Sequence, residues 1–312
     1  MEYRRAFLLL VLGMIVVMGA LPSAIQAGEG GLTNYVPAFY GDLGLAMEPP
    51  DGLSFRNDVF FFSGDIGGSL RSGEIQASVD VSLVYNYLSI LYKPGFKVLG
   101  APVAFSVTPT FGYADIEASV AVGGLSKQFN DDRAGIGDLT FGAMFYASHQ
   151  NLHFSWNNYV VTPVGEYDVD QLANIGVNYW TFESDLAATY LNENTGQDYS
   201  VVAGYGYNTE NDDTDYKSGD ELHVDFVANQ FFSETFAVGA NGYYYKQIGD
   251  DSGEGALLGA FKGEGAGIGP AIYYIGKIAG KQVAFVAKWV HDYHSENRVE
   301  SDYAYASFMF SL

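Results

Sequence analysis

The 312-residue sequence contains no cysteine. Disulfide bonds, thiolate metal sites and cysteine nucleophiles are therefore excluded, and so is a lipid anchor on an N-terminal cysteine. Basic residues are also few, because 15 lysines and arginines stand against 37 aspartates and glutamates, which gives a net charge of −22. A chain this acidic repels nucleic acid and lacks a basic membrane-binding face, so we expect no nucleic-acid partner.

Long hydrophobic runs are missing beyond the N-terminal segment, so the rest of the chain is not expected to contain a transmembrane helix. The N-terminal segment has Arg4 and Arg5, then an apolar run over 6–21, and a small-residue junction at Ala27. This order is typical of a secretory signal peptide, and a single N-terminal membrane helix is the alternative. We predict that residues 1–27 are a signal peptide, cleaved on export.

Aromatic residues and glycine are abundant, with 24 tyrosines, 22 phenylalanines and 38 glycines. They occur where apolar side chains alternate with small or polar ones, as in YSVVAGYGYN at 199–208. A period of two predicts β-strands that are apolar on one face. Twelve such segments can be counted, at 53–63, 75–91, 101–114, 135–148, 151–162, 178–191, 197–209, 219–231, 235–247, 262–275, 281–293 and 301–312.

The connections between these segments alternate between short and long. Short joints such as SHQN and FSET are followed by long ones, for example the polar runs at 63–74, 163–178 and 209–220. Bacterial outer-membrane barrels sort their connections in this way, whereas a secreted β-sandwich, the main competing fold, has no reason to do so. We therefore predict an all-β fold over residues 53–312: an antiparallel transmembrane β-barrel of about 12 strands, with short periplasmic turns and long extracellular loops.

The barrel fold brings further expectations about location and partners. The chain would lie in the outer membrane of a Gram-negative bacterium, in contact with outer-membrane lipid. Its last strand ends with Phe308, Phe310 and Leu312 on one face, which resembles the signal that the outer-membrane assembly machinery recognises. Residues 28–52 form an irregular leader that contains Tyr35 and Tyr40. This leader is expected either to enter the lumen as a plug or to be disordered.

Several long runs resemble one outer-membrane family, named for the meta-pathway of phenol degradation. The resemblance implies a β-barrel that handles aromatic or other hydrophobic compounds, as a channel for the uptake of such small solutes. It carries over no catalytic or binding residues, and the alternative is a structural or surface-interaction barrel without an open pore. The matching runs are PPDGLSFRNDVFFFSGD (49–65), TPVGEYDVDQLANIGVNYWTF (162–182), TYLNENTG (189–196), YGYNTENDDTDYKSGDELHVD (205–225), GYYYKQIGDDSGEGALLGAFKG (242–263) and KWVHDYHSENR (288–298).

Two of the long loops contain apolar residues where a free loop would be polar. We expect these side chains to fold over the barrel mouth and bind small apolar solutes there, or else to pack only loop on loop. The candidate mouth-lining residues are Tyr167, Leu172, Trp180, Leu257, Leu258 and Phe261.

Charged residues inside the predicted strands should face a hydrated or paired lumen, because a charge facing lipid is costly. The candidates are Asp80, Asp138, His153, Asp225 and Lys288. We expect them to form structural pairs, with a transport role as the alternative. The alternation places Val81, Leu83 and Tyr85 toward lipid with Asp80 toward the lumen, and Phe285, Ala287 and Trp289 toward lipid with Lys288 toward the lumen.

Catalytic and cofactor signals are weak, and we expect neither an enzyme nor a cofactor. His153, Ser155 and Asn157 share one face of a strand, as a hydrolase would require, but they directly follow a short turn and a polar lumen lining explains them. His291 and Asp292 point to opposite faces, which argues against a metal site there. The run at 211–222 starts like a calcium loop but lacks its glycine and its closing glutamate, so no metal site is expected.

Overall fold

The computed structural model describes Glu29 and residues 33–40, 42–70, 75–122, 125–256, 262–278 and 280–312, so the expected signal peptide lies outside the described residues. No helix among these residues is long and apolar enough to cross a membrane. The strands are β1 Gly52–Leu70, β2 Ile75–Lys93, β3 Lys97–Val98, β4 Ala101–Thr108, β5 Thr110–Val122, β6 Leu125–Ile136, β7 Leu139–His149, β8 Leu152–Thr162, β9 Thr181–Asn192, β10 Gln197–Asn208, β11 Glu210–Asn211, β12 Tyr216–Lys217, β13 Glu221–Phe231, β14 Phe236–Gln247, β15 Glu264–Ile278, β16 Lys281–Glu296 and β17 Glu300–Ser311.

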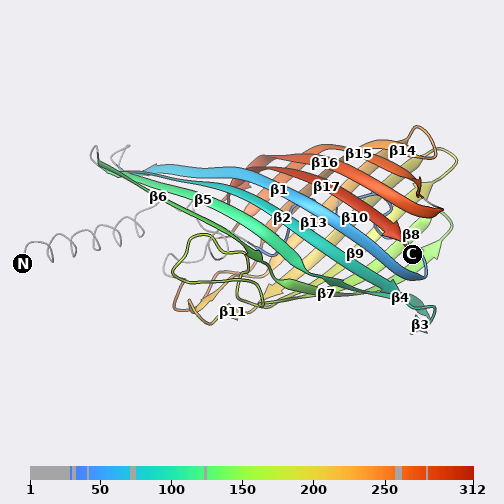
Figure 1. Ribbon diagram of the computed structural model, residues 1–312, viewed down its shortest axis with the longest axis horizontal. Helices are drawn as coiled ribbons and strands as arrows, with labels where there is room; N and C mark the ends of the chain where they lie inside the picture. The colour runs from blue at the N-terminus through green and yellow to red at the C-terminus, as the bar shows by residue number, and fades with distance from the viewer. Residues whose placement is uncertain are drawn as a thin grey trace, which may run out of the picture.

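The long strands form one closed antiparallel barrel (Figure 1). Successive strands pair with each other, and β1 pairs with β17 to close the sheet. Two of the twelve wall strands are interrupted: β4 and β5 are separated by Pro109, and β6 and β7 are separated by Gly137 and Asp138. Proline has no N–H to donate to the ladder, which accounts for the first break. With each pair counted once, the wall has the twelve strands that the alternation predicts.

Residues that alternate along each strand point in turn to the outside and to the inside of the barrel. On β10, Tyr199 and Val201 are exposed on the outside, whereas Ser200 and Val202 are buried inside. On β16, Trp289 is likewise exposed on the outside. An apolar outer face and a mixed inner face are what a barrel in lipid requires.

Two hairpins extend well beyond the rest of the barrel, at the end that carries the long loops (Figure 1). The pairing of β1 with β2 continues to Leu70↔Ile75, and that of β5 with β6 continues to Val122↔Leu125. Residues 63–74 were predicted to be a loop, and this prediction is wrong for most of the run. Their glycines and serines are poor strand formers, but the hairpin ladder continues through them.

The predicted facing of β2 is also wrong. Val81 and Leu83 are buried on the inside of the barrel, where they pack with Ala173 and Ile175 of the 163–180 loop. Asp80 is exposed on the opposite face. The loop supplies an apolar surface inside this part of the barrel, so the apolar row of β2 turns inward to meet it.

Candidate functional site

The described part of the leader, Glu29 and residues 33–40 and 42–50, runs along the lumen from the long-loop end to the short-turn end. At the long-loop end, Asn211 and Thr214 donate hydrogen bonds of 2.8 and 2.7 Å to the Glu29 carboxylate. Burial raises the pKa of this carboxyl above its usual value, against the effect of these donors. At the short-turn end, Glu48 lies 2.6 Å from Nζ of Lys93, the last residue of β2.

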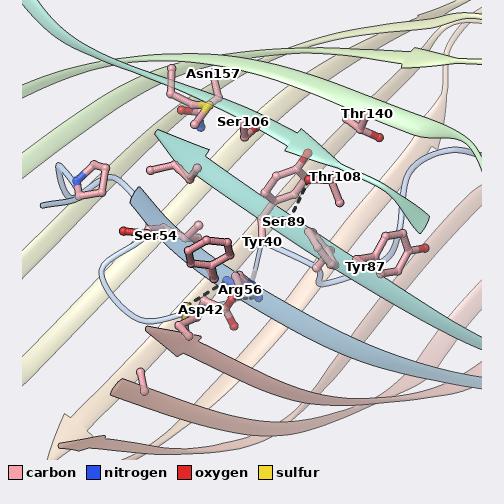
Figure 2. Close-up of a pocket in the computed structure, with 18 of the residues that line it drawn as sticks. Tyr40, Asp42, Ser54, Arg56, Tyr87, Ser89, Ser106, Thr108, Thr140 and Asn157 are labelled. Atoms are coloured by element: carbon pink, nitrogen blue, oxygen red, sulfur yellow. Dashed lines mark hydrogen bonds and ion pairs between the residues drawn. The ribbon is translucent and has the colours of Figure 1, made fainter. Parts of the chain in front are cut away.

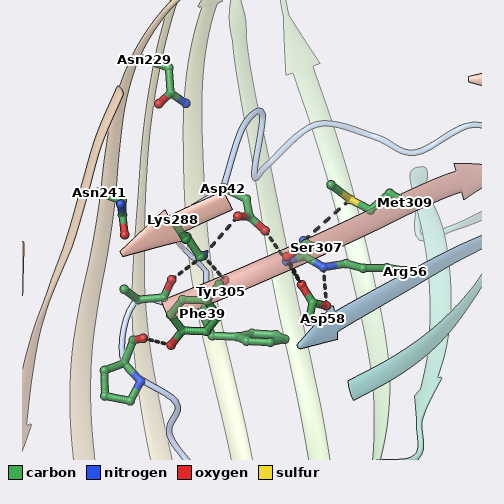
Figure 3. Close-up of polar contacts among 12 residues, drawn as sticks. Phe39, Asp42, Arg56, Asp58, Asn229, Asn241, Lys288, Tyr305, Ser307 and Met309 are labelled. Atoms are coloured by element: carbon green, nitrogen blue, oxygen red, sulfur yellow. Dashed lines mark hydrogen bonds and ion pairs between the residues drawn. The ribbon is translucent and has the colours of Figure 1, made fainter. Parts of the chain in front are cut away.

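A buried ionic cluster holds the middle of the leader (Figure 3). Nζ of Lys288 lies 3.1 Å from the Asp42 carboxylate and donates hydrogen bonds to the carbonyl oxygens of Ala38 (2.6 Å) and Phe39 (3.0 Å). Arg56 pairs with the same Asp42 carboxylate from the other side. Buried charges are tolerated only when they are paired and hydrogen-bonded, so these contacts fix the leader against β1 and β16.

A second cluster holds the leader against β9 and β13. The imidazole of His223 stacks on the rings of Tyr35 and Tyr40, with centroids 4.4 and 5.5 Å away. The Tyr40 hydroxyl donates to Glu183 at 2.9 Å, and the Tyr35 hydroxyl donates to Asp225 at 3.1 Å. The leader therefore lies against one side of the lumen.

A cavity of about 500 Å³ remains beside the leader (Figure 2). Its wall is formed mainly by β1, β2, β4, β7 and β8, together with residues of β16 and β17. Some of the hydroxyl groups that line the cavity already have hydrogen-bond partners in the wall, since Ser89 and Thr108 hydrogen-bond to each other at 2.8 Å. Its only described cation is Arg56, which is neutralised by Asp42 and Asp58. The apolar lining consists mainly of Phe39, Tyr40, Leu45, Met47, Tyr87, Leu91, Met144, Tyr146, Tyr159 and Val161.

A smaller cavity of about 140 Å³ adjoins the first and extends toward the 163–180 loop. It is lined by Phe62, Leu83 and Tyr85 of the wall and by Ile175 of the loop. The two cavities share six lining residues, which are Asn34, Tyr35, Val36, Tyr87, Thr140 and Val161. Together they follow the leader through much of the barrel, with Thr140 at their junction.

The 163–180 loop is held inside the barrel mouth by carboxylates of the wall. Asp138 accepts hydrogen bonds from the backbone N–H groups of Gly165 (2.8 Å) and Val177 (2.9 Å). Asp131 accepts one from the N–H of Leu172 at 2.9 Å. Buried Asp138 therefore anchors both ends of the loop, and the position of the loop limits the width of the smaller cavity.

The predicted mouth-lining residues that the structure describes are not gathered at one place. Tyr167 lies at the mouth, where its hydroxyl donates to Glu29 at 3.4 Å. Leu172 is exposed on the loop surface, with 52% of its area accessible. Trp180 lies elsewhere than predicted, because it stacks with Phe182 among the exposed side chains of the outer face. The remaining candidates, Leu257, Leu258 and Phe261, lie outside the described residues.

Some of the predicted lumen residues lie in the lumen, and others do not. Asp138, Asp225 and Lys288 are buried inside the barrel. Asp80 is not in the lumen, because β2 faces the other way there. His153 hydrogen-bonds to Ser148 at 2.9 Å beside the short turn, and no hydrogen bond to Ser155 is found among the described side chains.

Several charged lumen residues of the two clusters were not predicted from the sequence, namely Asp42, Arg56, Glu183, Asp185 and His223. All of them except Asp42 share a pattern that the sequence shows. Charged residues two positions apart within an apolar strand, as at 56 and 58, 183 and 185, and 223 and 225, share one face. Where a strand crosses lipid, that face is expected to be the inner one, because a charge facing lipid is costly.

A family model described as "Putative MetA-pathway of phenol degradation" matches residues 65–308, which confirms the resemblance read from the sequence. No curated protein sequence matches the chain at a significant level. Among solved structures, the COG4313 outer membrane channel from Pseudomonas putida F1 is similar, with a TM-score of 0.60 and 15% identity over 86% of this chain and 98% of that one. The transport unit of the autotransporter AIDA-I from Escherichia coli is less similar, with a TM-score of 0.46 and 14% identity over 88% and 94%.

Proposed function

The chain belongs to the family of the MetA-pathway of phenol degradation, and on this basis we propose that it is an outer-membrane channel for the uptake of small hydrophobic or aromatic compounds. The fold supports this proposal, because the similar barrel from Pseudomonas putida is an outer membrane channel. In an outer-membrane channel of this kind, the short turns would face the periplasm and the long loops would face the outside of the cell. Solutes would enter beside the 163–180 loop and pass along the leader.

The observation that carries the proposal is the aromatic-lined cavity beside the leader. Pockets of about 300–1,000 Å³ hold most small ligands, and an apolar cavity of about 150 Å³ already binds benzene. The cavity of about 500 Å³ therefore has room for a single-ring compound. Its tyrosine and phenylalanine rings offer stacking surfaces, and the neutralised Arg56 is a donor for a carboxylate or hydroxyl group on the solute.

Thr140 gives a direct test, because it lies at the junction of the two cavities. Replacing it with tryptophan should fill the junction and lower the uptake of labelled benzoate by cells that depend on this protein. Phe141→Trp is the matched control, since Phe141 is the next residue and is 48% exposed on the outer face. Both variants should show the heat-modifiable electrophoretic mobility that indicates a folded barrel.

The uptake rate should fall several-fold in Thr140→Trp and stay near the native rate in Phe141→Trp. Equal rates in native protein, both variants and cells without the gene would contradict uptake through these cavities.

A second candidate function is a closed structural or surface-interaction barrel. The leader favours it, because its residues run the length of the lumen and Asp42 is held by the buried Lys288 and the partly buried Arg56. A closed barrel would show no conductance in planar bilayers even after residues 28–50 are deleted. The channel proposal instead expects conductance in the full chain, with a clear increase after the deletion.

A further inference from the structure

Three side chains of the cluster on β9 and β13 converge on one point. Asp185 pairs across the sheet with Gly204, and Gly204 pairs with His223, so these three positions lie at one level on adjacent strands. Nε2 of His223 lies 3.0 Å from Oε1 of Glu183 and 3.5 Å from Oδ1 of Asp185. One ligand atom from each of Glu183, Asp185 and His223 lies within 4.8 Å of the other two.

Asp185 is the unexplained member of this group. Its side chain is completely buried, and no group among the described residues donates a hydrogen bond to either of its carboxylate oxygens. The cluster also holds more acid than base, since Glu183, Asp185 and Asp225 surround a single imidazole. A buried carboxylate without donors is costly unless it coordinates a cation or takes up a proton.

Gly204 makes room at the same point. A Cβ atom at this position would lie 1.9 Å from Nε2 of His223 and 2.4 Å from Oδ1 of Asp185. Only glycine can therefore stand between the two side chains. The imidazole of His223 and the carboxylate of Asp185 can therefore approach each other over the backbone of Gly204.

We propose that Glu183, Asp185 and His223 bind one divalent transition-metal ion, of which Zn²⁺ is the best match. Metal–ligand bonds of about 2.0–2.2 Å in a tetrahedral arrangement place ligand atoms roughly 3.3–3.6 Å apart, close to the 3.0 and 3.5 Å found here. One imidazole and two carboxylates suit Zn²⁺ better than Ca²⁺ or Mg²⁺, which prefer oxygen ligands alone.

The surroundings of the imidazole fit a metal ligand. Nδ1 of His223 lies 2.8 Å from Asp225, so donation of its proton to that carboxylate leaves the Nε2 lone pair directed at the metal, as is usual for zinc-bound histidines. The Tyr40 hydroxyl donates to Glu183. Because Tyr40 belongs to the leader and Glu183 would bind the ion, the ion would help to hold the leader against β9 and β13. This structural role does not depend on which solute is transported.

Metal binding is tested on the tag-free full-length mature protein, stripped with chelator and titrated with Zn²⁺, with metal content measured by mass spectrometry. Asp185→Asn and His223→Gln should each weaken binding at least 10-fold. Two control variants remove other carboxylates. Asp198→Asn changes a buried lumen acid that accepts from the leader at Gly44 N. Glu264→Gln changes the partly exposed cluster that Glu264 forms with His294 and Glu296.

The expected result is about one Zn²⁺ per native chain, retained in both controls and lost in both cluster variants. Co²⁺ should give the strong visible absorption of a four-coordinate site in the native protein, a readout that needs no variant to fold. The proposal is overturned by native protein that takes up no Zn²⁺ or binds Co²⁺ only in its weakly absorbing six-coordinate form. It is also overturned by undiminished binding in Asp185→Asn, or by loss of binding in Glu264→Gln alone.

Discussion

Nζ of Lys288, in the middle of β16, lies 3.1 Å from the carboxylate of Asp42 in the leader, and the lysine side chain has no exposed surface. Two segments 246 residues apart are thus joined by a buried ion pair inside the barrel. Such a pair is costly to break, because the remaining charge is left buried without its partner. Docking of the leader should therefore depend strongly on this contact.

Asp42→Asn should release the middle of the leader. Removing one partner of a buried pair costs roughly 3–5 kcal/mol, so the urea midpoint for loss of leader docking should fall markedly. Asp51→Asn is the control. Asp51 pairs with Lys93 at the exposed rim, where an ion pair contributes only about 0–1 kcal/mol. Similar urea midpoints for the two variants would show that the Asp42 contacts do not hold the leader.

Asp138→Asn should loosen the 163–180 loop. Asp138 accepts two backbone N–H groups, and an amide nitrogen cannot replace both acceptors. Losing a hydrogen bond to a charged group costs roughly 1.5–3 kcal/mol, so protease cleavage within the loop should become about 10-fold faster or more. Asp170→Asn, at an exposed position of the same loop, should leave the cleavage rate unchanged. Equal cleavage of both variants would count against the anchor.

Glu29 should make docking at the mouth depend on pH. Its pKa is raised from 4.5 by burial, so the docked leader holds a proton more tightly than the released leader. Docking is then strongest below about pH 4.5 and weakens as the pH rises through the raised pKa. The chain has no cysteine, so a spin label on Asn34→Cys reports this directly. The label should gain mobility with rising pH, and Glu29→Gln should abolish that change.

A charged residue introduced on the outer face of the barrel should destabilise the protein. Phe226 lies in the middle of β13 and is exposed on the outside. Arginine there should lower the free energy of unfolding in lipid by roughly 2–4 kcal/mol, as expected for a lipid-facing cation near the midplane. Val169→Arg, in the 163–180 loop, should be nearly neutral. A neutral effect of Phe226→Arg would contradict the assignment of this face to lipid.

The strand count and most strand positions could be predicted because alternation is a local property. Each wall segment repeats its polarity every two residues, as in the tyrosine row that starts at Tyr199. The lengths of the two extended hairpins could not be predicted, because Gly67 and Gly68 favour loops and are kept in strand only by pairing with β2. Pairing partners lie outside the local sequence.

Which face of a strand points inward was predictable only where one face carried charge. Lys288 identified the inner face of β16 correctly. On β2 the same rule failed, because Asp80 lies at the rim of the barrel wall, level with the start of β17, and Val81 meets the inserted loop. The cluster around His223 depends on contacts between the leader and distant strands, and no local pattern contains those contacts.

Selective permeation is the decisive measurement for transport of aromatic solutes through the lumen. Liposomes that contain the purified full-length protein are loaded or bathed with labelled benzoate or with a sugar of similar size, and the initial fluxes are compared with those of protein-free liposomes. The protein is expected to increase the benzoate flux much more than the sugar flux, because the aromatic-lined cavity binds the ring. Equal increases for both solutes, or no increase for either, would contradict this expectation.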